Sequence, residues 1–324
     1  MHFETIYKSE TVQAFWNRGA APGQTDGPAF VTFEGIGLGK GKTTPAPFGS
    51  VLAEKLGLDL VHVVPRAPDW YHYPDMDACL AAVRPHMGPR TFAYGSSMGG
   101  FASARFADRL GLTRALCLSP QYSIQPAVVP FETRWQKHAT RIDFLNDDTI
   151  PPRAARVWIL TDVTDPQERA HAELIAQSGP TEVLDVSFAG HPVGTALREA
   201  RALAPIMEMF LEGREDPAAL RTLLETTVQE RSVSVLVARA AQAKKKDREA
   251  LLRKALELKP DNARVALALG IFLLRTKRVD EAHTLLKPIF TPAVDPKFAA
   301  KYSRVCSKLG LEPSLLPPAT TAAK

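Results

Sequence analysis

Residues 90–110 read RTFAYGSSMGGFASARFADRL, and this stretch decides how the first part of the chain folds. The apolar run 90–94 predicts a buried strand, and the segment from Gly99 onward predicts a helix. Between them lies a G-x-S-x-G motif centred on Ser97, in the strand–turn–helix context that this motif requires. Side chains two residues before and after Ser97 would collide with neighbouring backbone in so sharp a turn, so Gly95 and Gly99 are needed. The pattern predicts an exposed serine hydroxyl at a helix N-terminus, placed to act as a nucleophile.

Two residues downstream are candidates to activate this serine. A serine hydroxyl is inert near neutral pH unless a base takes its proton and a carboxylate orients that base. Asp165 follows the apolar run 155–161, and His191 follows the apolar run 181–188. Asp162 is the competing carboxylate. Because the acid is expected a few residues past the end of the strand, we favour Asp165, which leaves Asp162 to cap the following helix.

Apolar runs alternate with helical windows through the first two-thirds of the chain. Strands are expected at 30–34, 58–65, 90–94, 115–119, 155–161 and 181–188. Helices are expected at 48–57, 75–84, 99–110, 166–178 and 194–210. Several of the strands are apolar on both faces, which is typical of buried parallel strands. The alternation predicts an α/β fold over residues 1–213, with a mostly parallel sheet, helices on both faces, and one or two edge strands within 1–17.

The stretch 121–154 interrupts this alternation with prolines and mixed polar residues. We expect an excursion between two strands, such as a small cap, because loops longer than ~15 residues in a compact domain are usually functional or disordered. Two aromatic clusters are candidates to line a substrate pocket: Trp70 and Tyr71 after one strand, and Trp135 within the excursion. Simple packing is the alternative for both. Arg134 is a candidate to hold a carboxylate or phosphate on the substrate.

After about residue 213 the strand signals stop and only helices are expected. Their predicted ranges are 216–228, 231–243, 247–258, 262–276, 279–289 and 296–309. Leu269-Gly270, Ala282 and Leu286 resemble the small and apolar positions of the tetratricopeptide repeat, although Ala266 stands where that family usually has a large aromatic. The resemblance implies a helical-repeat region over 214–311. A short helical appendage to the first domain is the alternative, and the tail 312–324 is expected to be disordered.

The first domain resembles the α/β-hydrolase superfamily over roughly residues 28–210. The resemblance implies Ser97 as nucleophile, Asp165 as orienting acid and His191 as general base. It also implies that the backbone N–H of Met98 is one oxyanion donor. The second donor would come from the loop that contains Gly35 and Ile36, where the usual His-Gly pair is absent. The motif together with LCLSPQYSI further along the chain also resembles bacterial hydrolases found near surface-polysaccharide genes.

The segment GIGLGKGKTT, residues 35–44, imitates a phosphate-binding loop. A true loop of that kind needs glycine at position 36, which is Ile36, and Pro45 and Pro47 would obstruct the helix that must follow. We therefore expect a loop on the oxyanion side, whose Lys40 and Lys42 would attract an anionic substrate.

Composition and charge exclude several classes of protein. The chain of 324 residues is 45% hydrophobic and 23% charged, which rules out global disorder. No run is long enough for a membrane-spanning helix, and the N-terminus lacks the pattern of a secretory signal. Three scattered cysteines, Cys79, Cys117 and Cys306, favour a reducing cytoplasm over a disulfide framework, and neither they nor the histidines have metal-ligand spacing. Residues 214–324 hold 21 basic and 12 acidic residues, whereas 1–213 hold 19 and 23.

Together these patterns predict a serine hydrolase that needs no cofactor and cleaves a carboxylic ester or thioester, from a small molecule or a glycan. An acyltransferase that passes the acyl group to a sugar or another alcohol has the same chemistry and stays open. A non-catalytic protein that binds a protein partner through 214–311 is the alternative from another class. The basic run Lys244–Lys246 lacks interleaved aromatics, so we expect no nucleic-acid site there.

Overall fold

The computed structural model describes residues 3–19, 29–36, 47–88, 90–145, 153–291 and 293–316. The chain forms two compact units, Met1–Val228 and Gln229–Lys324. The sequence placed this division at about residue 213, whereas in the structure the helical segment 217–228 belongs to the first unit.

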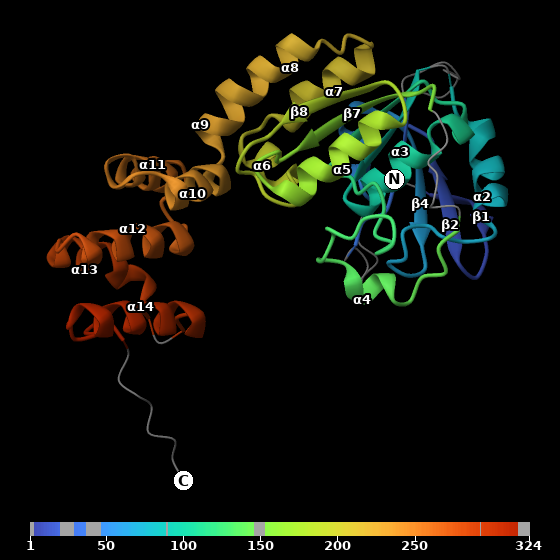
Figure 1. Ribbon diagram of the computed structural model, residues 1–324. Coiled ribbons are helices and arrows are strands. Elements are labelled where there is room, and N and C mark those ends of the chain that lie inside the picture. The colour runs from blue at the N-terminus through green and yellow to red at the C-terminus, as the bar shows by residue number, and fades with distance from the viewer. Residues whose placement is uncertain are drawn as a thin grey trace. The chain divides into compact units, whose positions relative to one another are not determined.

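The first unit is built on one eight-stranded sheet (Figure 1). Its strands are β1 Glu4–Lys8, β2 Val12–Asn17, β3 Ala29–Phe33, β4 Asp59–Pro65, β5 Thr91–Ser96, β6 Arg114–Leu118, β7 Arg156–Thr161 and β8 Thr181–Asp185. They lie in the order β1-β2-β4-β3-β5-β6-β7-β8. The β1–β2 and β2–β4 pairs are antiparallel, and all the pairs from β4 to β8 are parallel. This is the mixed, mostly parallel sheet of the α/β-hydrolase fold, so the expected fold class and the edge strands within 1–17 are confirmed.

Both faces of the sheet are covered because its central strands are apolar on both sides. Alternate residues of β3 show this, since Val31 and Phe33 belong to the core beneath α3, whereas Phe30 packs through Phe92 toward Phe210 on the opposite face. The helices of this unit are α1 Ser50–Leu56, α2 Met76–Val83, α3 Met98–Phe106, α4 Gln136–Ala139, α5 Pro166–Gln177, α6 Gly194–Glu199, α7 Leu203–Glu212 and α8 Pro217–Leu223. Short 3₁₀ turns follow α2 and α3 at Arg84–His86 and Asp108–Leu110, and a π turn, Leu224–Val228, follows α8.

The helix expected at 194–210 is broken in the structure. Arg201 has a φ of 57°, and the N–H of Ala202 donates to the carbonyl of Leu197. A residue in the left-handed region ends an α-helix, so α6 stops there and α7 begins in a new direction. The expectation of one continuous helix was wrong.

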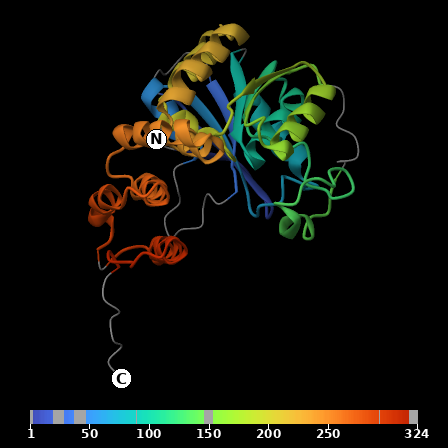
Figure 2. The same ribbon diagram turned by 60° about the vertical axis from the view of Figure 1, so that its left-hand side comes forward.

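In Figures 1 and 2, α4 of the excursion is the green helix below the yellow-green α5. The side chain of Gln167, in the first turn of α5, donates to the carbonyl of Phe131 and to the hydroxyl of Thr133. The described part of the excursion therefore packs on α5, close to where that helix begins.

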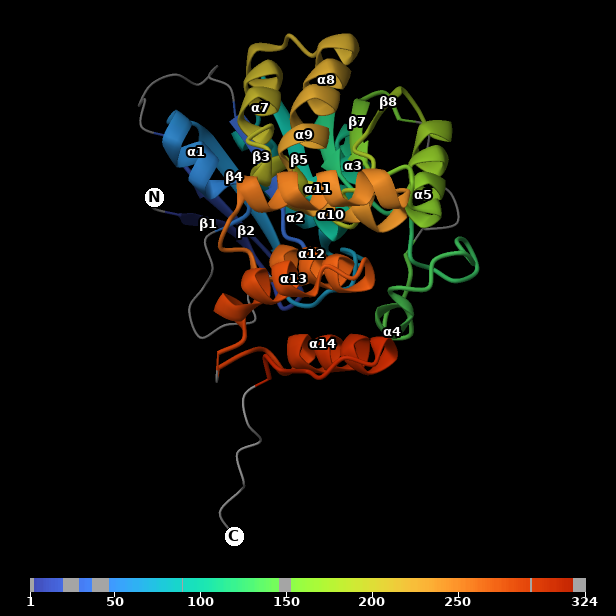
Figure 3. The same cartoon turned by 90° about the vertical axis from the view of Figure 1, so that its left-hand side faces the viewer.

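The second unit is entirely helical among its described residues. Its helices are α9 Gln229–Arg231, α10 Val233–Gln242, α11 Lys245–Leu258, α12 Ala263–Arg275, α13 Val279–Leu286 and α14 Pro296–Leu309, with a 3₁₀ turn at Lys287–Ile289. Figure 3 shows α10 with α11, then α12 with α13, then α14, in successive layers. Ala282 and Leu286 are fully buried, and a Cβ built on Gly270 would lie 2.6 Å from Cγ of Leu286. The small residue at 270 therefore lets α12 and α13 approach closely, as the repeat pattern indicated.

Within the residues that the structure describes, none of the helices is long and apolar enough to cross a membrane. Residues 317–324 of the tail that was expected to be disordered lie outside the described residues. Lys40 and Lys42, which were expected to attract an anionic substrate, also lie outside them.

We predict that Gly270→Ala destabilises the second unit by about 1–3 kcal/mol, because the added methyl group overpacks the contact with Leu286. All four tryptophans (Trp16, Trp70, Trp135 and Trp158) lie in the first unit. In urea unfolding followed by circular dichroism, the variant should therefore lose helix at a lower urea concentration than the native protein. The transition followed by tryptophan fluorescence should stay at the native urea concentration. Unchanged unfolding by both probes would contradict the packing described here.

Candidate active site

Ser97 stands on the strained turn that the motif predicted. It joins β5 to α3 with φ 55° and ψ −122°. A Cβ on Gly95 would lie 2.1 Å from the carbonyl oxygen of Gly99, and one on Gly99 would lie 2.2 Å from the carbonyl oxygen of Phe33. No side chain fits at either position, so the turn exists only because both residues are glycine. The N–H of Ser97 donates to the carbonyl of Leu118 (2.8 Å), which ties the turn to β6.

His191 reaches Ser97 from the loop after β8. Its Nε2 lies 2.9 Å from the Ser97 hydroxyl oxygen. Asp162 holds this loop, since its carboxylate accepts the N–H groups of Phe188 (3.0 Å) and Gly190 (2.8 Å). The structure therefore brings together the serine and the histidine that the sequence singled out, and it gives Asp162 the task of bracing the histidine loop.

Glu168, and not Asp165, is the carboxylate that contacts the histidine. Oε1 of Glu168 lies 2.9 Å from Nδ1 of His191. Asp165 is the N-cap of α5, where its carboxylate accepts the N–H groups of Gln167 (2.8 Å) and Glu168 (3.3 Å). Asp165 was expected beside His191, but the side chain of Glu168 lies there instead. The helix cap that we assigned to Asp162 is made by Asp165.

Glu168 is fully surrounded by donors. Its side chain is 1% exposed, Thr161 donates to Oε2 (2.9 Å), and Nη1 of Arg134 contacts Oε1 (2.5 Å). Burial alone favours the neutral acid, but the hydrogen bonds and charges of His191 and Arg134 outweigh it and hold the pKa of Glu168 below its ordinary value. Glu168 is therefore ionised at neutral pH, and a carboxylate can only accept the Nδ1 proton of His191.

Arg134 is engaged by protein carboxylates, contrary to the expectation that it would hold a substrate anion. Besides Glu168 it contacts Glu132, through Nε (3.1 Å to each oxygen) and Nη2 (2.6 Å). Glu132 also lies 2.9 Å from Nε2 of His171, whose Nδ1 accepts the N–H of Tyr122 (3.1 Å). Burial would raise the pKa of Glu132, but the hydrogen bonds from His171 and Arg134 prevail and lower it to about 2.

The two segments expected to hold an oxyanion lie beside each other. A Cβ on Gly35 would lie 3.3 Å from the carbonyl oxygen of Ser96, so the loop after β3 runs along the Ser97 turn. Met98 is the first residue of α3, where a backbone N–H has no partner within the helix. The N–H of Gly35 donates to Oε1 of Glu34 (2.9 Å). Of the two loop residues expected to hold an oxyanion, Ile36 is therefore the better candidate for the donor.

Glu34 is itself fixed by buried neighbours. Its Oε2 lies 3.0 Å from Nε2 of His62, and Nδ1 of His62 lies 2.7 Å from the hydroxyl of Thr32. The hydroxyl of Tyr71 donates to the carbonyl of Glu34 (2.8 Å). Tyr71, expected to line a substrate pocket, is therefore a support of the oxyanion-side loop and only 2% exposed.

Trp135 is the aromatic residue that lies against the candidate triad. Its ring centroid is 5.6 Å from that of His191, at an interplanar angle of 62°. Trp70 lies behind it, with centroids 5.7 Å apart, and is fully buried with its indole N–H donating to Gln121 (3.2 Å). Of these two expected pocket residues, Trp135 touches the site and Trp70 supports Trp135.

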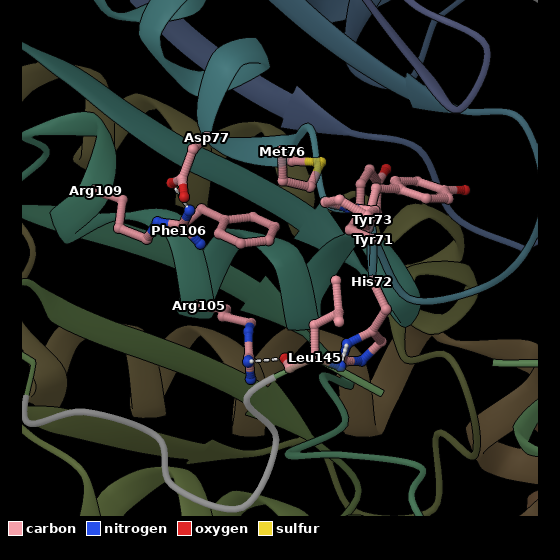
Figure 4. A pocket seen from close by; sticks show the side chains of 10 residues that line it. Tyr71, His72, Tyr73, Met76, Asp77, Arg105, Phe106, Arg109 and Leu145 are labelled. Atoms are coloured by element: carbon pink, nitrogen blue, oxygen red, sulfur yellow. Dashed lines mark hydrogen bonds and ion pairs between the residues drawn. The ribbon is translucent and has the colours of Figure 1, made fainter. Parts of the chain in front are cut away.

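A separate cavity of about 500 Å³ lies between α2, α3 and the end of the described excursion, and neither Ser97 nor His191 lines it (Figure 4). Its lining residues are Tyr71, His72, Tyr73, Pro74, Met76, Asp77, Arg105, Phe106, Arg109 and Leu145. Arg109 pairs with Asp77, and Arg105 donates to the carbonyl of Leu145 (3.1 Å). We assign no part of the chemistry to this cavity. Among the described residues there is also no cluster of three or more His, Cys, Asp or Glu side chains that is arranged to hold a metal ion.

Comparison with protein families finds one match, in the C-terminal part of the chain. Residues 239–305 match the tetratricopeptide repeat family. Comparison with curated protein sequences gives no match.

Several solved structures are distantly similar to the chain. One is the capsule O-acetyltransferase of Neisseria meningitidis serogroup A (10% identity over 65% of this chain and 93% of that chain, TM-score 0.44), also solved in complex with CoA. Others are an alpha-beta serine hydrolase homologue from Coxiella burnetii (17%, 66% and 97%, 0.41) and a putative carboxylesterase from Lactobacillus plantarum (13%, 65% and 98%, 0.39).

We predict that Asp165→Ala costs about 1 kcal/mol of unfolding free energy and leaves the site assembled, because the side chain caps a helix and does not touch His191. Asp295→Ala is the matched control, since Asp295 caps α14 in the second unit and also precedes a proline. Urea unfolding followed by tryptophan fluorescence should shift for Asp165→Ala and not for Asp295→Ala. A shift of several kcal/mol for Asp165→Ala would mean that this carboxylate does more than cap a helix.

Proposed function

We propose that this protein is a serine hydrolase that cleaves a carboxylic ester or thioester through an acyl-enzyme on Ser97. The observation that carries the proposal is the continuous chain of contacts from Ser97 to His191 (2.9 Å) and from His191 to Glu168 (2.9 Å). Three side chains from separate segments, with a hydroxyl at one end and a buried carboxylate at the other, form the arrangement that activates a serine.

Each residue has a defined task in this mechanism. Glu168 accepts the Nδ1 proton of His191 and so keeps Nε2 free to accept the proton of the Ser97 hydroxyl. As that proton moves, the serine oxygen attacks the acyl carbon, and the imidazolium is stabilised by the ionised Glu168. His191 then returns the proton to the alcohol or thiol that leaves. Water, deprotonated by the same nitrogen, releases the acyl group and restores the serine.

The oxyanion of each tetrahedral intermediate would be held by two backbone N–H groups. Met98 supplies one at the start of α3, where the helix dipole also favours negative charge. Ile36 supplies the other, because the N–H of Gly35 is already bonded to Glu34. Of the two loop residues expected from the sequence, Gly35 and Ile36, this assignment keeps Ile36 as the donor.

Acyl transfer to an alcohol stays the alternative within the same chemistry, since an acceptor hydroxyl takes the place of water in the second half of the reaction. Adding sugars or other alcohols to an active preparation and analysing the products separates the two. The tetratricopeptide match and the basic character of the C-terminal region support a further proposal, that this region binds a protein partner. A pulldown with residues 214–324 tests it.

We predict that a fluorophosphonate probe labels Ser97 in the native protein, because only an activated serine attacks phosphorus at a useful rate. Ser97→Ala should abolish the label. Ser96→Ala is the matched control, since Ser96 is the adjacent hydroxyl and lies outside the contact with His191. Labelling that survives Ser97→Ala, or a folded native protein that does not label, would contradict the proposal.

We predict that Glu168→Gln lowers kcat for a p-nitrophenyl ester by about 10³–10⁴-fold, because the amide no longer fixes the tautomer or the charge of His191. Asp165→Ala should stay within a few-fold of the native rate. A panel of esters of increasing chain length supplies the substrate for both measurements. If Asp165→Ala were the more damaging change, Glu168 would not be the acid.

A further inference from the structure

The acid of the candidate triad is shared between the base and an arginine. Oε1 of Glu168 accepts from Nδ1 of His191 (2.9 Å) and also contacts Nη1 of Arg134 (2.5 Å). The guanidinium and the imidazole therefore meet at one oxygen. A permanent positive charge at that place weakens the attraction between Glu168 and a protonated His191.

A second buried carboxylate compensates for that charge. Glu132 is 1% exposed at its side chain and binds the guanidinium of Arg134 on the side away from Glu168. Among the described residues, the other charged or titratable side chain in contact with Glu132 is His171, which is fully buried. The N–H of Tyr122 donates to Nδ1 of His171, so that nitrogen is an acceptor and Nε2 is the nitrogen that donates to Glu132.

The charges of the cluster can then be counted. Glu132 and Glu168 are negative and Arg134 is positive, so the charges of Glu132 and Arg134 sum to zero. The net charge is therefore that of Glu168 alone, as if Glu132 and Arg134 were absent. Removal of either member of the pair leaves one uncompensated charge beside Glu168, of opposite sign in the two cases.

We propose that Glu132 cancels the charge that Arg134 places beside Glu168, so that Glu168 keeps its full attraction for a protonated His191, and that the excursion supplies both residues to the site. Both are positioning residues, since they act on the base through Glu168. The inference rests on the proposed function, because it assigns His191 the part of the base.

The same segment meets the base from a second direction. Trp135 follows Arg134 directly and packs edge-on against the ring of His191. The other polar and charged groups that face His191 are Ser97 at the start of α3 and Glu168 of α5. Asp162 meets the loop of His191 through the backbone N–H groups of Phe188 and Gly190. The ring of His138 packs at about 60° to the rings of Trp135 and Trp70. Among the described residues, the charged side chains that act on His191 in this arrangement are Glu168, in direct contact with its ring, and Arg134 and Glu132, which act through Glu168.

The test follows the titration of the His191 ring by nuclear magnetic resonance in a Ser97→Ala background, with Arg134→Met, Glu132→Gln and the double variant. Arg134→Met should raise the titration midpoint by about one pH unit or more, because two carboxylates then face the imidazolium with no guanidinium between them. Glu132→Gln should lower it by a similar amount. The double variant should return close to the native midpoint, because the two charges cancel.

Two further variants keep the test decisive. Arg134→Lys retains the charge and should stay near the native midpoint, which separates charge from shape. If Arg134→Met does not fold, Glu132→Gln and Arg134→Lys carry the test. In proteins that retain Ser97, the acid limb of the pH dependence of kcat/KM should move in the same directions as the midpoint.

Midpoints that do not move, or that move in the same direction for Arg134→Met and Glu132→Gln, would overturn the inference. The ring titration needs no turnover and no serine, so it is independent of the proposed reaction. If the opposite shifts are found and Ser97 nonetheless fails to label with fluorophosphonate, the proposed function fails and the charge pair stands.

Discussion

The backbone turn at Ser97 is the constraint on which the rest of the site depends. Two close approaches, from Gly95 to the carbonyl of Gly99 and from Gly99 to the carbonyl of Phe33, leave room for hydrogen atoms only. They let α3 start directly behind β5 while the loop after β3 runs alongside. Ser97, whose φ on that turn is positive, presents its hydroxyl at the edge where the parallel strands end. Strain of this kind persists only where the surrounding structure fixes it, here through the hydrogen bond from Ser97 to Leu118.

The remaining groups are brought to the serine by carboxylates that take no part in the proposed chemistry. Asp162 fixes the loop that carries His191, and Asp165 fixes the first turn of the helix that carries Glu168. The three acids lie close together in sequence but have separate tasks: bracing a loop, capping a helix and orienting an imidazole. Glu132 is a fourth, delivered by the excursion, and it offsets the charge of Arg134.

Much of the fold and part of the site could be predicted from the sequence. The sheet was predicted from runs of residues that are apolar on both faces, and the turn from the spacing of Gly95, Ser97 and Gly99. Both predictions rest on local patterns, namely hydrophobic periodicity and the steric exclusion of side chains. His191 was found because it comes soon after the apolar run 181–188. We favoured Asp165 as the acid, whereas Glu168 is the carboxylate that contacts His191. Asp165-Pro166-Gln167-Glu168 has the cap, the proline at the first position and the acid at the third that begin a helix. With this pattern, Asp165 is expected to turn toward the helix backbone. The contact between Arg134 and Glu168 spans 34 positions and depends on how the excursion packs on α5, which no local pattern reports.

The central claim is that Ser97 forms a covalent acyl intermediate with His191 as its base. The most direct measurement is a rapid-mixing experiment with a p-nitrophenyl ester, in which the nitrophenol released and the mass of the intact protein are followed together. We predict a burst close to one equivalent of nitrophenol per chain, with the acyl group recovered on the peptide that contains Ser97 and lost again as turnover continues. A folded protein that gives neither a burst nor an acylated Ser97 with any ester of the panel would contradict it.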